Sequence, residues 1–168
     1  MKFLKDMGFK CSHCHFYVSA SSVLCPQPLL SGVKNRNHCP YCLWSRHLDL
    51  YQAGDRLAAC KARMKPVGLT LKRTRKKYGL ESHGELMLIH LCNDCGKVSI
   101  NRIAADDVPG TVFDIYESSL ELDPQMKILL EESGIQALGD ADRTVVHAQL
   151  FGHSSPAPRL LSPLSFLG

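Results

Sequence analysis

Three segments rich in apolar residues, separated by polar turns, stand out in the middle of the chain. They run from residue 60 to 71, from 85 to 91 and from 97 to 101. Their length and apolar content are typical of β-strands, and a basic segment lies between the first two. The pattern therefore predicts a small ribbon of strands joined by hairpin turns.

Residues that start and stop helices mark the acidic part of the chain. Asp123 is a helix-capping residue followed by proline at the first helical position, and Gly134 closes the segment. This punctuation predicts a short helix from about residue 124 to 133. Residues 140 to 150 have an acidic start and an apolar face, which predicts a second helix. We expect these two helices to pack on the ribbon or on each other.

Residues 43 to 48, before the ribbon, are compatible with the start of a further short helix. Taken together, the elements indicate a small α+β fold in which β-hairpins are followed by short C-terminal helices. A chain of 168 residues with 45% apolar and 21% charged residues forms one domain, or one domain with an appendage.

The element pattern divides the chain into three parts. We expect a cysteine-rich domain over residues 9–107 and an acidic helical extension over residues 108–152 that packs on it. Residues 153–168 are rich in proline and serine and are expected to form a disordered tail.

Charge is distributed unevenly between the two ends of the chain. Residues 1–105 carry 17 lysines and arginines against 6 acidic residues, whereas residues 106–168 carry 3 against 10. Between residues 61 and 77 there is no acidic residue, and the basic ones are Lys61, Arg63, Lys65, Lys72, Arg73, Arg75, Lys76 and Lys77. So dense a cluster repels itself unless solvent or a polyanion screens it. The cluster indicates either a solvated hairpin tip or a surface that binds nucleic acid.

No stretch of the sequence has the apolar run of a secretory signal or the roughly 18 consecutive apolar residues of a membrane helix. We therefore expect a cytoplasmic protein with no membrane partner. In that reducing compartment, eight cysteines are typical of metal ligands rather than of a disulfide framework.

Six of the cysteines form three Cys-x-x-Cys pairs. Two thiolates three positions apart on a tight turn can bind one tetrahedral ion from the same side, so each pair is half of a structural zinc site. The pairs are Cys11/Cys14, Cys39/Cys42 and Cys92/Cys95. Because 24 residues separate the first pair from the second, a usual gap between the halves of one site, we assign these two pairs to site one.

The third pair needs two further ligands to complete site two. Cys60 lies at the start of the first predicted strand, where a hairpin returns it towards Cys92. The fourth position is open to His47, His90 or His38, and we choose His47. The sequence thus predicts two zinc ions, and Cys25 is left as a spare thiol.

The second pair, Cys39-Pro40-Tyr41-Cys42, also matches the active-site string of glutaredoxins. Redox catalysis needs an exposed thiolate at the start of a helix that follows an apolar strand. Here the string follows the polar segment 34–38, and another cysteine pair is available to share a metal. The sequence therefore favours a structural metal site.

The string Arg36-Asn37-His38-Cys39-Pro40 resembles the signature of the RNHCP domain family. The resemblance extends over about residues 9 to 107, through Cys42-Leu43, Ser45-x-His47-x-Asp49, Gly54-Asp55-Arg56, Cys60, Met64-x-Pro66, His90-x-Cys92-x-x-Cys95-Gly96 and Asn101-Arg102-Ile103-Ala104. It implies a zinc-ribbon-type domain, found mainly in bacteria, and carries no established biochemical activity to this chain.

The resemblance also bears on the ligands. All seven cysteines of the two predicted sites fall on family positions, whereas Cys25 does not. His47 and His90 both match, so the resemblance leaves the eighth ligand open. His15 departs from the pattern, because the family usually has glycine there.

The features together favour a non-enzymatic zinc protein that binds RNA, with ribosomal RNA as the expected partner and translation as the setting. The residues expected to contact the phosphate backbone are Arg36, Lys72, Arg73, Arg75, Lys76, Lys77 and Arg102. Tyr78 is the only aromatic residue close to the basic loop, so base stacking there is expected to be weak.

Two other classes of function stay open. A metal-dependent hydrolase, such as a nuclease, would use a polar set made of Asn37, His38, His47, Asp49, Asp55, Glu85, Asp106 and Asp107. It needs an open position on the metal, which two sites of four protein ligands would deny. A protein-interaction module would instead use the acidic helices of residues 114–150 as its docking face.

Overall fold

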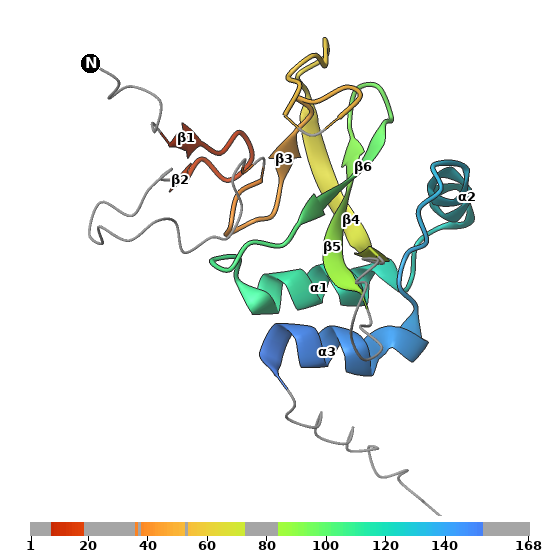
Figure 1. The fold of residues 1–168 in the computed structure, drawn as a ribbon. Coiled ribbons are helices and arrows are strands. Elements are labelled where there is room, and N and C mark those ends of the chain that lie inside the picture. The colour runs from red at the N-terminus through yellow and green to blue at the C-terminus, as the bar shows by residue number, and fades with distance from the viewer. Residues whose placement is uncertain (1–7, 19–35, 37, 53, 73–83, 153–168) are drawn as a thin grey trace, which may run out of the picture.

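The computed structural model describes residues 8–18, 36, 38–52, 54–72 and 84–152 (Figure 1). Two short strands, β1 (Phe9–Lys10) and β2 (Tyr17–Val18), form a small antiparallel sheet. A second antiparallel sheet has the order β3-β4-β5-β6, with strands β3 (Ser45–Arg46), β4 (Arg63–Lys72), β5 (Glu85–Cys92) and β6 (Val98–Arg102). The helices follow the sheets in sequence and are α1 (Pro109–Ser119), α2 (Pro124–Glu132), a 3-10 turn (Asp140–Asp142) and α3 (Arg143–Phe151).

This architecture confirms the predicted α+β fold of β-hairpins followed by short helices. The three predicted strands correspond to β4, β5 and β6, and the two predicted helices correspond to α2 and α3. The cap of α2 is as expected, because the Asp123 carboxylate accepts a hydrogen bond of 2.9 Å from the backbone N–H of Met126.

The prediction of a short helix at residues 43 to 48 is wrong. Leu43 has a positive φ of 60°, which ends the preceding turn, and Ser45 then pairs with Met64 in an antiparallel ladder. Sequence periodicity missed helix α1, whose first turn begins with Pro109 and has no side-chain cap. Proline at this position is pre-set for a helix and has no N–H to satisfy, so it carries the start signal by itself.

Helices cover both faces of the large sheet. On one face, α1 and α3 pack on β4 and β5 through Leu69, Leu88, Val112, Tyr116 and Val146. In Figure 1, α1 lies across the lower part of the sheet and α3 lies beneath α1. On the other face, Leu130 of α2 packs with Val67 and Ile89. Strand β5 is consequently buried along almost its whole length.

Close contact between α1 and β4 depends on a glycine. A Cβ atom on Gly68 would lie 3.1 Å from the Cβ of Ser119, tighter than ordinary van der Waals contact. The chain also shifts its register with β5 between Pro66 and Gly68, which marks a β-bulge at this point. The hydroxyl of Tyr116 donates a hydrogen bond of 2.7 Å to the carbonyl of Gly139, so α1 also fixes the segment that leads to α3.

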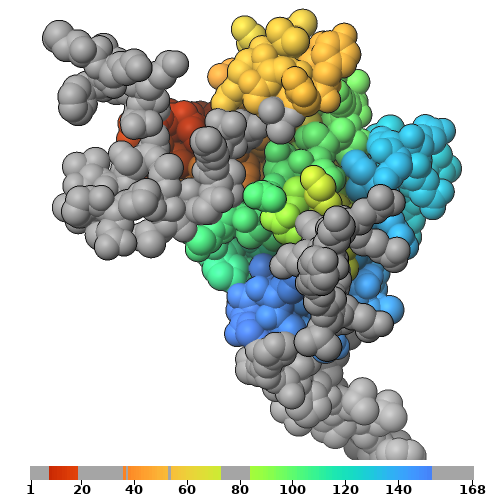
Figure 2. All heavy atoms as spheres, viewed as in Figure 1, coloured from red at the N-terminus to blue at the C-terminus, as the bar shows by residue number. Residues whose placement is uncertain are grey.

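Cysteine turns gather at the end of the sheet where β4 begins and β5 ends. Met64 pairs with Cys92 at this end, and the small β1–β2 sheet lies beside it in Figures 1 and 2. Among the helices that the structure describes, none combines the length and hydropathy that a bilayer crossing requires. Four predicted contacts and several other residues lie outside the described residues: Arg73, Arg75, Lys76, Lys77, Asn37, Cys25 and the expected tail of residues 153–168.

Candidate metal centres

The three Cys-x-x-Cys turns share one backbone conformation. In each turn, the carbonyl of the first cysteine accepts a hydrogen bond from the residue that follows the second cysteine, from His15, Leu43 and Gly96 at 3.1, 2.9 and 3.2 Å. Those three residues all have a positive φ, of 64°, 60° and 71° respectively. The repeated geometry presents two thiols on the same side of each turn, and we call these turns knuckles 1, 2 and 3.

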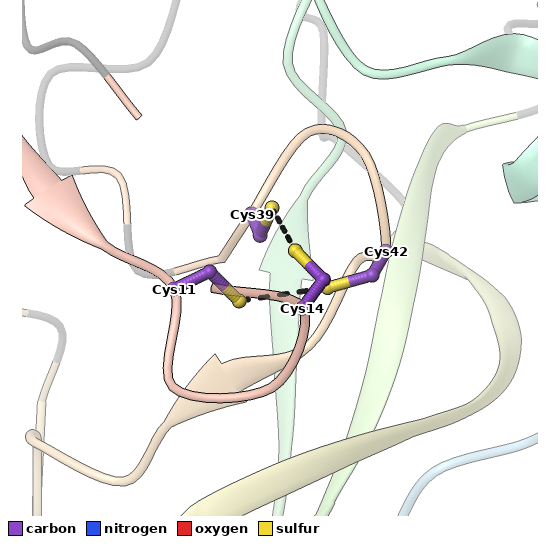
Figure 3. Close-up of side chains that lie close together, drawn as sticks. All are labelled: Cys11, Cys14, Cys39 and Cys42. Atoms are coloured by element: carbon purple, nitrogen blue, oxygen red, sulfur yellow. Dashed lines mark hydrogen bonds between the residues drawn. The ribbon is translucent and has the colours of Figure 1, made fainter. Parts of the chain in front are cut away.

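Knuckles 1 and 2 face each other and form site one (Figure 3). The Sγ atoms of Cys11 and Cys42 are 3.6 Å apart, and those of Cys14 and Cys39 are also 3.6 Å apart. All four ligand atoms lie within 4.8 Å of one another. Cys11 and Cys39 are buried, with Val18 packed against them, so the site sits in a small apolar cluster of its own.

Knuckle 3 supplies half of site two, and the loop between β3 and β4 supplies the other half. Nδ1 of His47 lies 3.0 Å from Sγ of Cys60 and 3.3 Å from Sγ of Cys95. Sγ of Cys60 lies 3.8 Å from that of Cys92 and 3.9 Å from that of Cys95. These four groups also lie within 4.8 Å of one another, so the structure brings His47 to the fourth position.

Both clusters fit a tetrahedral zinc ion. Zinc–sulfur bonds of about 2.3 Å at tetrahedral angles separate two sulfurs by about 3.8 Å, which is close to the distances in both sites. Cysteine thiolates and imidazole nitrogen are the ligands of structural zinc. Each site could therefore hold one zinc ion with four protein ligands, which confirms the expected pair of zinc sites.

The thiols of site one show why a cation is needed. Burial opposes ionisation of Cys11, but backbone N–H groups of Cys14 and His13 outweigh it and lower the pKa of this thiol to about 7. For Cys42 burial dominates, and the neighbouring thiols add to it, so its pKa is raised. In the same way burial raises the pKa of Cys39. Four thiolates at this distance repel each other unless a metal ion compensates their charge.

Site two also contains one thiol with a lowered pKa and one with a raised pKa. Cys92 has a lowered pKa, because backbone N–H groups of Cys95 and Asp94 outweigh its burial. Cys95 has a raised pKa: the backbone N–H of Lys97 lowers it, but burial and the thiols of Cys92 and Cys60 outweigh this effect. Each site therefore holds one thiol that backbone N–H groups prepare for ionisation, Cys11 in site one and Cys92 in site two. Cys42 and Cys95 have raised pKa values and depend on the charge of a metal to ionise.

The other two histidines considered for the eighth ligand lie elsewhere. Nε2 of His38 donates a hydrogen bond of 2.8 Å to the buried carboxylate of Asp107. Nε2 of His90 donates to the carbonyl of Leu43 at 2.7 Å, and its Nδ1 accepts from the amide of Asn101 at 2.8 Å. Burial lowers the pKa of His90 to about 4, so this ring is neutral at neutral pH. Both rings are buried in the protein core.

Arg36 is held in a carboxylate clamp. Its guanidinium donates to Asp106 and to Asp107, and only 11% of its side chain is exposed. The first and third residues of the Arg36–Pro40 string therefore bind the same turn before α1. This arrangement fixes knuckle 2 to the end of β6 and leaves Arg36 no free charge for a nucleic acid.

The remaining polar residues of the hydrolase hypothesis are spread over separate places. Asp55 accepts hydrogen bonds from four backbone N–H groups of the loop 50–57, and the one from Gln52 contributes most to lowering its pKa. Asp49 accepts from Gly54 and Arg56 in the same loop. Glu85 pairs with Arg102 at 2.9 Å. In the described part of the chain, these carboxylates brace loops and strand ends rather than converge on a metal.

Among the predicted phosphate contacts, two are exposed residues of the described sheet. Lys72 ends β4 at an exposed position, and the Arg102 side chain is 59% exposed despite its pair with Glu85. The other members, Arg73, Arg75, Lys76 and Lys77, lie outside the described residues.

Sequence reasoning missed one group of surface residues near the metal sites. Phe16, Tyr17 and Tyr41 are 63%, 61% and 53% exposed, and the rings of Phe16 and Tyr41 lie 5.4 Å apart. Arg46, next to buried Ser45 and His47, is also exposed. The sequence does contain a signal for this group, because the aromatic residues lie inside a knuckle or just after one. A small zinc site has no core that could bury them, so they are expected to be exposed.

Comparison with known proteins identifies the domain. The family model of the RNHCP domain matches residues 6–113, which is well over half of the chain. No curated protein and no solved structure is detectably similar to the chain. The matched range contains all eight ligands of the two candidate zinc sites, together with the Arg36–Pro40 string and the carboxylates that bind it. The chain therefore belongs to the RNHCP domain family.

Proposed function

We propose that this protein is a non-enzymatic zinc module that binds the phosphate backbone of RNA. The observation that carries the proposal is the run of eight basic residues, without one acid, between residues 61 and 77. Lys61, Arg63, Lys65 and Lys72 of this run lie at exposed positions along β4 or just before it. Phosphates are the polyanions that such a surface attracts most strongly in a cell.

The metal sites support binding rather than hydrolysis. A catalytic zinc keeps one position open for water, whereas each cluster here offers four protein ligands. Sulfur-rich sites of this kind stabilise a small fold that lacks a large core. If the metal ions serve the fold, the function of the protein depends on contacts between its surface and a partner.

The proposed contacts are Lys72, Arg102 and the loop residues Arg73, Arg75, Lys76 and Lys77. Arg36 is not among them, because Asp106 and Asp107 neutralise its guanidinium. We place the protein in the cytoplasm. Among the polyanions there, we choose ribosomal RNA as its partner, because its phosphate backbone offers an extensive negative surface.

Charge reversal tests this proposal. The variant Arg73→Glu, Lys76→Glu, Lys77→Glu is compared with the wild type in fluorescence anisotropy with labelled ribosomal RNA fragments over a range of potassium chloride concentrations. Lys127→Glu, on the exposed surface of α2, is the control. We expect the loop variant to lose affinity and its salt slope to fall by about 2 to 3, since each lost phosphate contact removes about one unit. Unchanged binding would overturn the proposal.

A protein partner at the acidic helices is a second, compatible proposal. Leu130 and Glu131 of α2 line a hollow of about 620 Å³, and Ile128 on the same helix is 54% exposed. The test is Glu131→Lys with Glu132→Lys in sedimentation with ribosomes. Loss of co-sedimentation with unchanged affinity for RNA supports a protein contact, and unchanged co-sedimentation overturns it.

A further inference from the structure

A basic hollow lies between the two zinc sites. Its volume is about 430 Å³, and it is lined from three directions, by knuckle 1, by the β3–β4 ladder and by knuckle 3. The lining residues that present polar side chains are Ser12, Arg46, Lys61, Arg63, Asn93 and Asp94. We call this hollow the knuckle cleft.

Three cations, Arg46, Lys61 and Arg63, line the knuckle cleft, together with one acid, Asp94. Arg46 and Arg63 are directly paired across β3 and β4, so their side chains leave the sheet on the same face. Lys61 has a positive φ of 47° immediately after the ligand Cys60, which places it by the metal site. Within the described ranges, no carboxylate forms an ion pair with Arg46, Lys61 or Arg63. Like charges paired across a ladder destabilise a sheet, so a bound anion would relieve them.

Exposed aromatic rings lie just after knuckle 1 in sequence and within knuckle 2. Phe16, Tyr17 and Tyr41 form what we call the aromatic patch, in which Phe16 and Tyr41 are in ring contact. The backbone N–H of Cys11 donates a hydrogen bond of 2.8 Å to the carbonyl of Phe16, while Ser12, the next residue, lines the knuckle cleft. The cleft and the patch therefore both border knuckle 1.

We infer that the knuckle cleft and the aromatic patch together bind single-stranded RNA. Arg46, Lys61 and Arg63 would hold successive phosphates, and the rings of the patch would stack on unpaired bases. The inference rests on the proposed function, because it takes RNA as the partner. It adds a second contact surface, distinct from the loop between β4 and β5, and it specifies the class of RNA.

Single strands are favoured over duplexes by the combination of groups. Bases in a duplex stack on one another, and their edges lie in a groove that side chains cannot read in A-form RNA. Bases of a single strand are free to stack on exposed aromatic rings while a positive groove follows the backbone. A purely basic surface would bind both forms, so the aromatic patch is the distinguishing feature.

Zinc is expected to be required for this surface. The cleft is lined by residues of knuckles 1 and 3, and the patch by residues of knuckles 1 and 2. The turns hold their geometry through thiols that repel each other without a metal, so removing zinc would separate the cations from the rings.

Two double variants of the full zinc-loaded chain test the inference. The cleft variant is Arg46→Glu with Arg63→Glu, the patch variant is Tyr17→Ala with Tyr41→Ala, and Lys127→Glu is the control. Affinity is measured by fluorescence anisotropy for a labelled single-stranded oligoribonucleotide and for its duplex. Zinc content is measured for each variant, and the neutral pair Arg46→Gln with Arg63→Gln replaces the glutamates if they lower it.

The expected results differ between the variants. The cleft variant loses about tenfold or more in affinity for the single strand, and its salt slope falls by about 2. The patch variant loses about fivefold or more for the single strand and keeps the salt slope and its affinity for the duplex. The control binds as the wild type does.

Other outcomes separate this inference from the proposed function. If the wild type binds neither RNA form, the proposed function fails and the inference fails with it. If the wild type binds RNA, and only the Arg73, Lys76 and Lys77 variant loses affinity, the knuckle cleft is not the site and the proposed function stands. The inference is also overturned if the cleft variant loses binding to phosphatidylserine vesicles but not to RNA, which would make the cleft a membrane contact.

Discussion

The imidazole of His38 donates a hydrogen bond of 2.8 Å to the carboxylate of Asp107, and both side chains are buried. The same carboxylate accepts a hydrogen bond from the backbone N–H of Ala104 at 2.7 Å and pairs with Arg36. One acid thus ties together two residues of the Arg36–Pro40 string and the turn before α1. The string therefore acts as a structural clamp on site one.

This clamp predicts losses of stability of different size for substitutions of two adjacent acids. Asp107→Ala leaves a buried histidine and a buried arginine without their partner, and should destabilise the folded state by about 3 kcal/mol. Asp106→Ala removes an acid whose side chain is 47% exposed, and should cost less than about 1 kcal/mol. Urea denaturation in the presence of zinc measures both. Equal losses for the two variants would contradict the clamp.

The clamp also shows where prediction from sequence reaches its limit. The ligand residues could be predicted because a short, fixed spacing on a tight turn determines their geometry, as with Cys39 and Cys42. Asp107 could not be assigned to His38 in the same way, since the two are 69 positions apart and meet only after β4, β5 and β6 have paired. The helix predicted at residues 43–48 failed for a related reason: tertiary pairing of Ser45 with Met64 prevails over local preference.

Substitution of the histidines separates a ligand from a core residue. His47→Ala removes the only nitrogen ligand of site two and should reduce the bound zinc from two ions to one. His47→Cys should keep both ions, because it replaces one zinc ligand with another. His90→Ala should keep both ions while lowering stability, since it removes a buried ring with two hydrogen bonds. Metal analysis by mass spectrometry measures the zinc content, and loss of zinc in His90→Ala would contradict the assignment.

The residue after each knuckle has a positive φ, which is strained for any residue except glycine. Substitutions that add or remove glycine at this position therefore test the knuckle geometry. Gly96 has a φ of 71° and open space around it, so Gly96→Ala should cost about 1 to 2 kcal/mol through backbone strain alone. His15 holds a φ of 64° without being glycine, so His15→Gly should leave stability unchanged or raise it by up to about 1 kcal/mol. Thermal unfolding of the zinc-loaded proteins compares them. A loss in His15→Gly as large as that in Gly96→Ala would count against a shared knuckle geometry.

Removal of a single thiol should affect one site only. Cys39→Ser takes a buried ligand from site one, so we expect one zinc ion to remain bound, in site two. Because β1 and β2 are two residues each, they have little to hold them without the metal, and proteolysis should begin near knuckle 1. Cys25→Ser is the matched control, since Cys25 belongs to neither predicted set of ligands. Loss of zinc in the control would mean that the ligand set is wrong.

Zinc X-ray absorption on the purified protein tests most directly the central claim that both metal sites are closed by four protein ligands. We predict two zinc ions per chain, with seven sulfur ligands and one nitrogen ligand shared between them and no bound water oxygen. An oxygen in the coordination shell, or a single zinc ion with fewer than four protein ligands, would contradict it and favour a metal-dependent hydrolase.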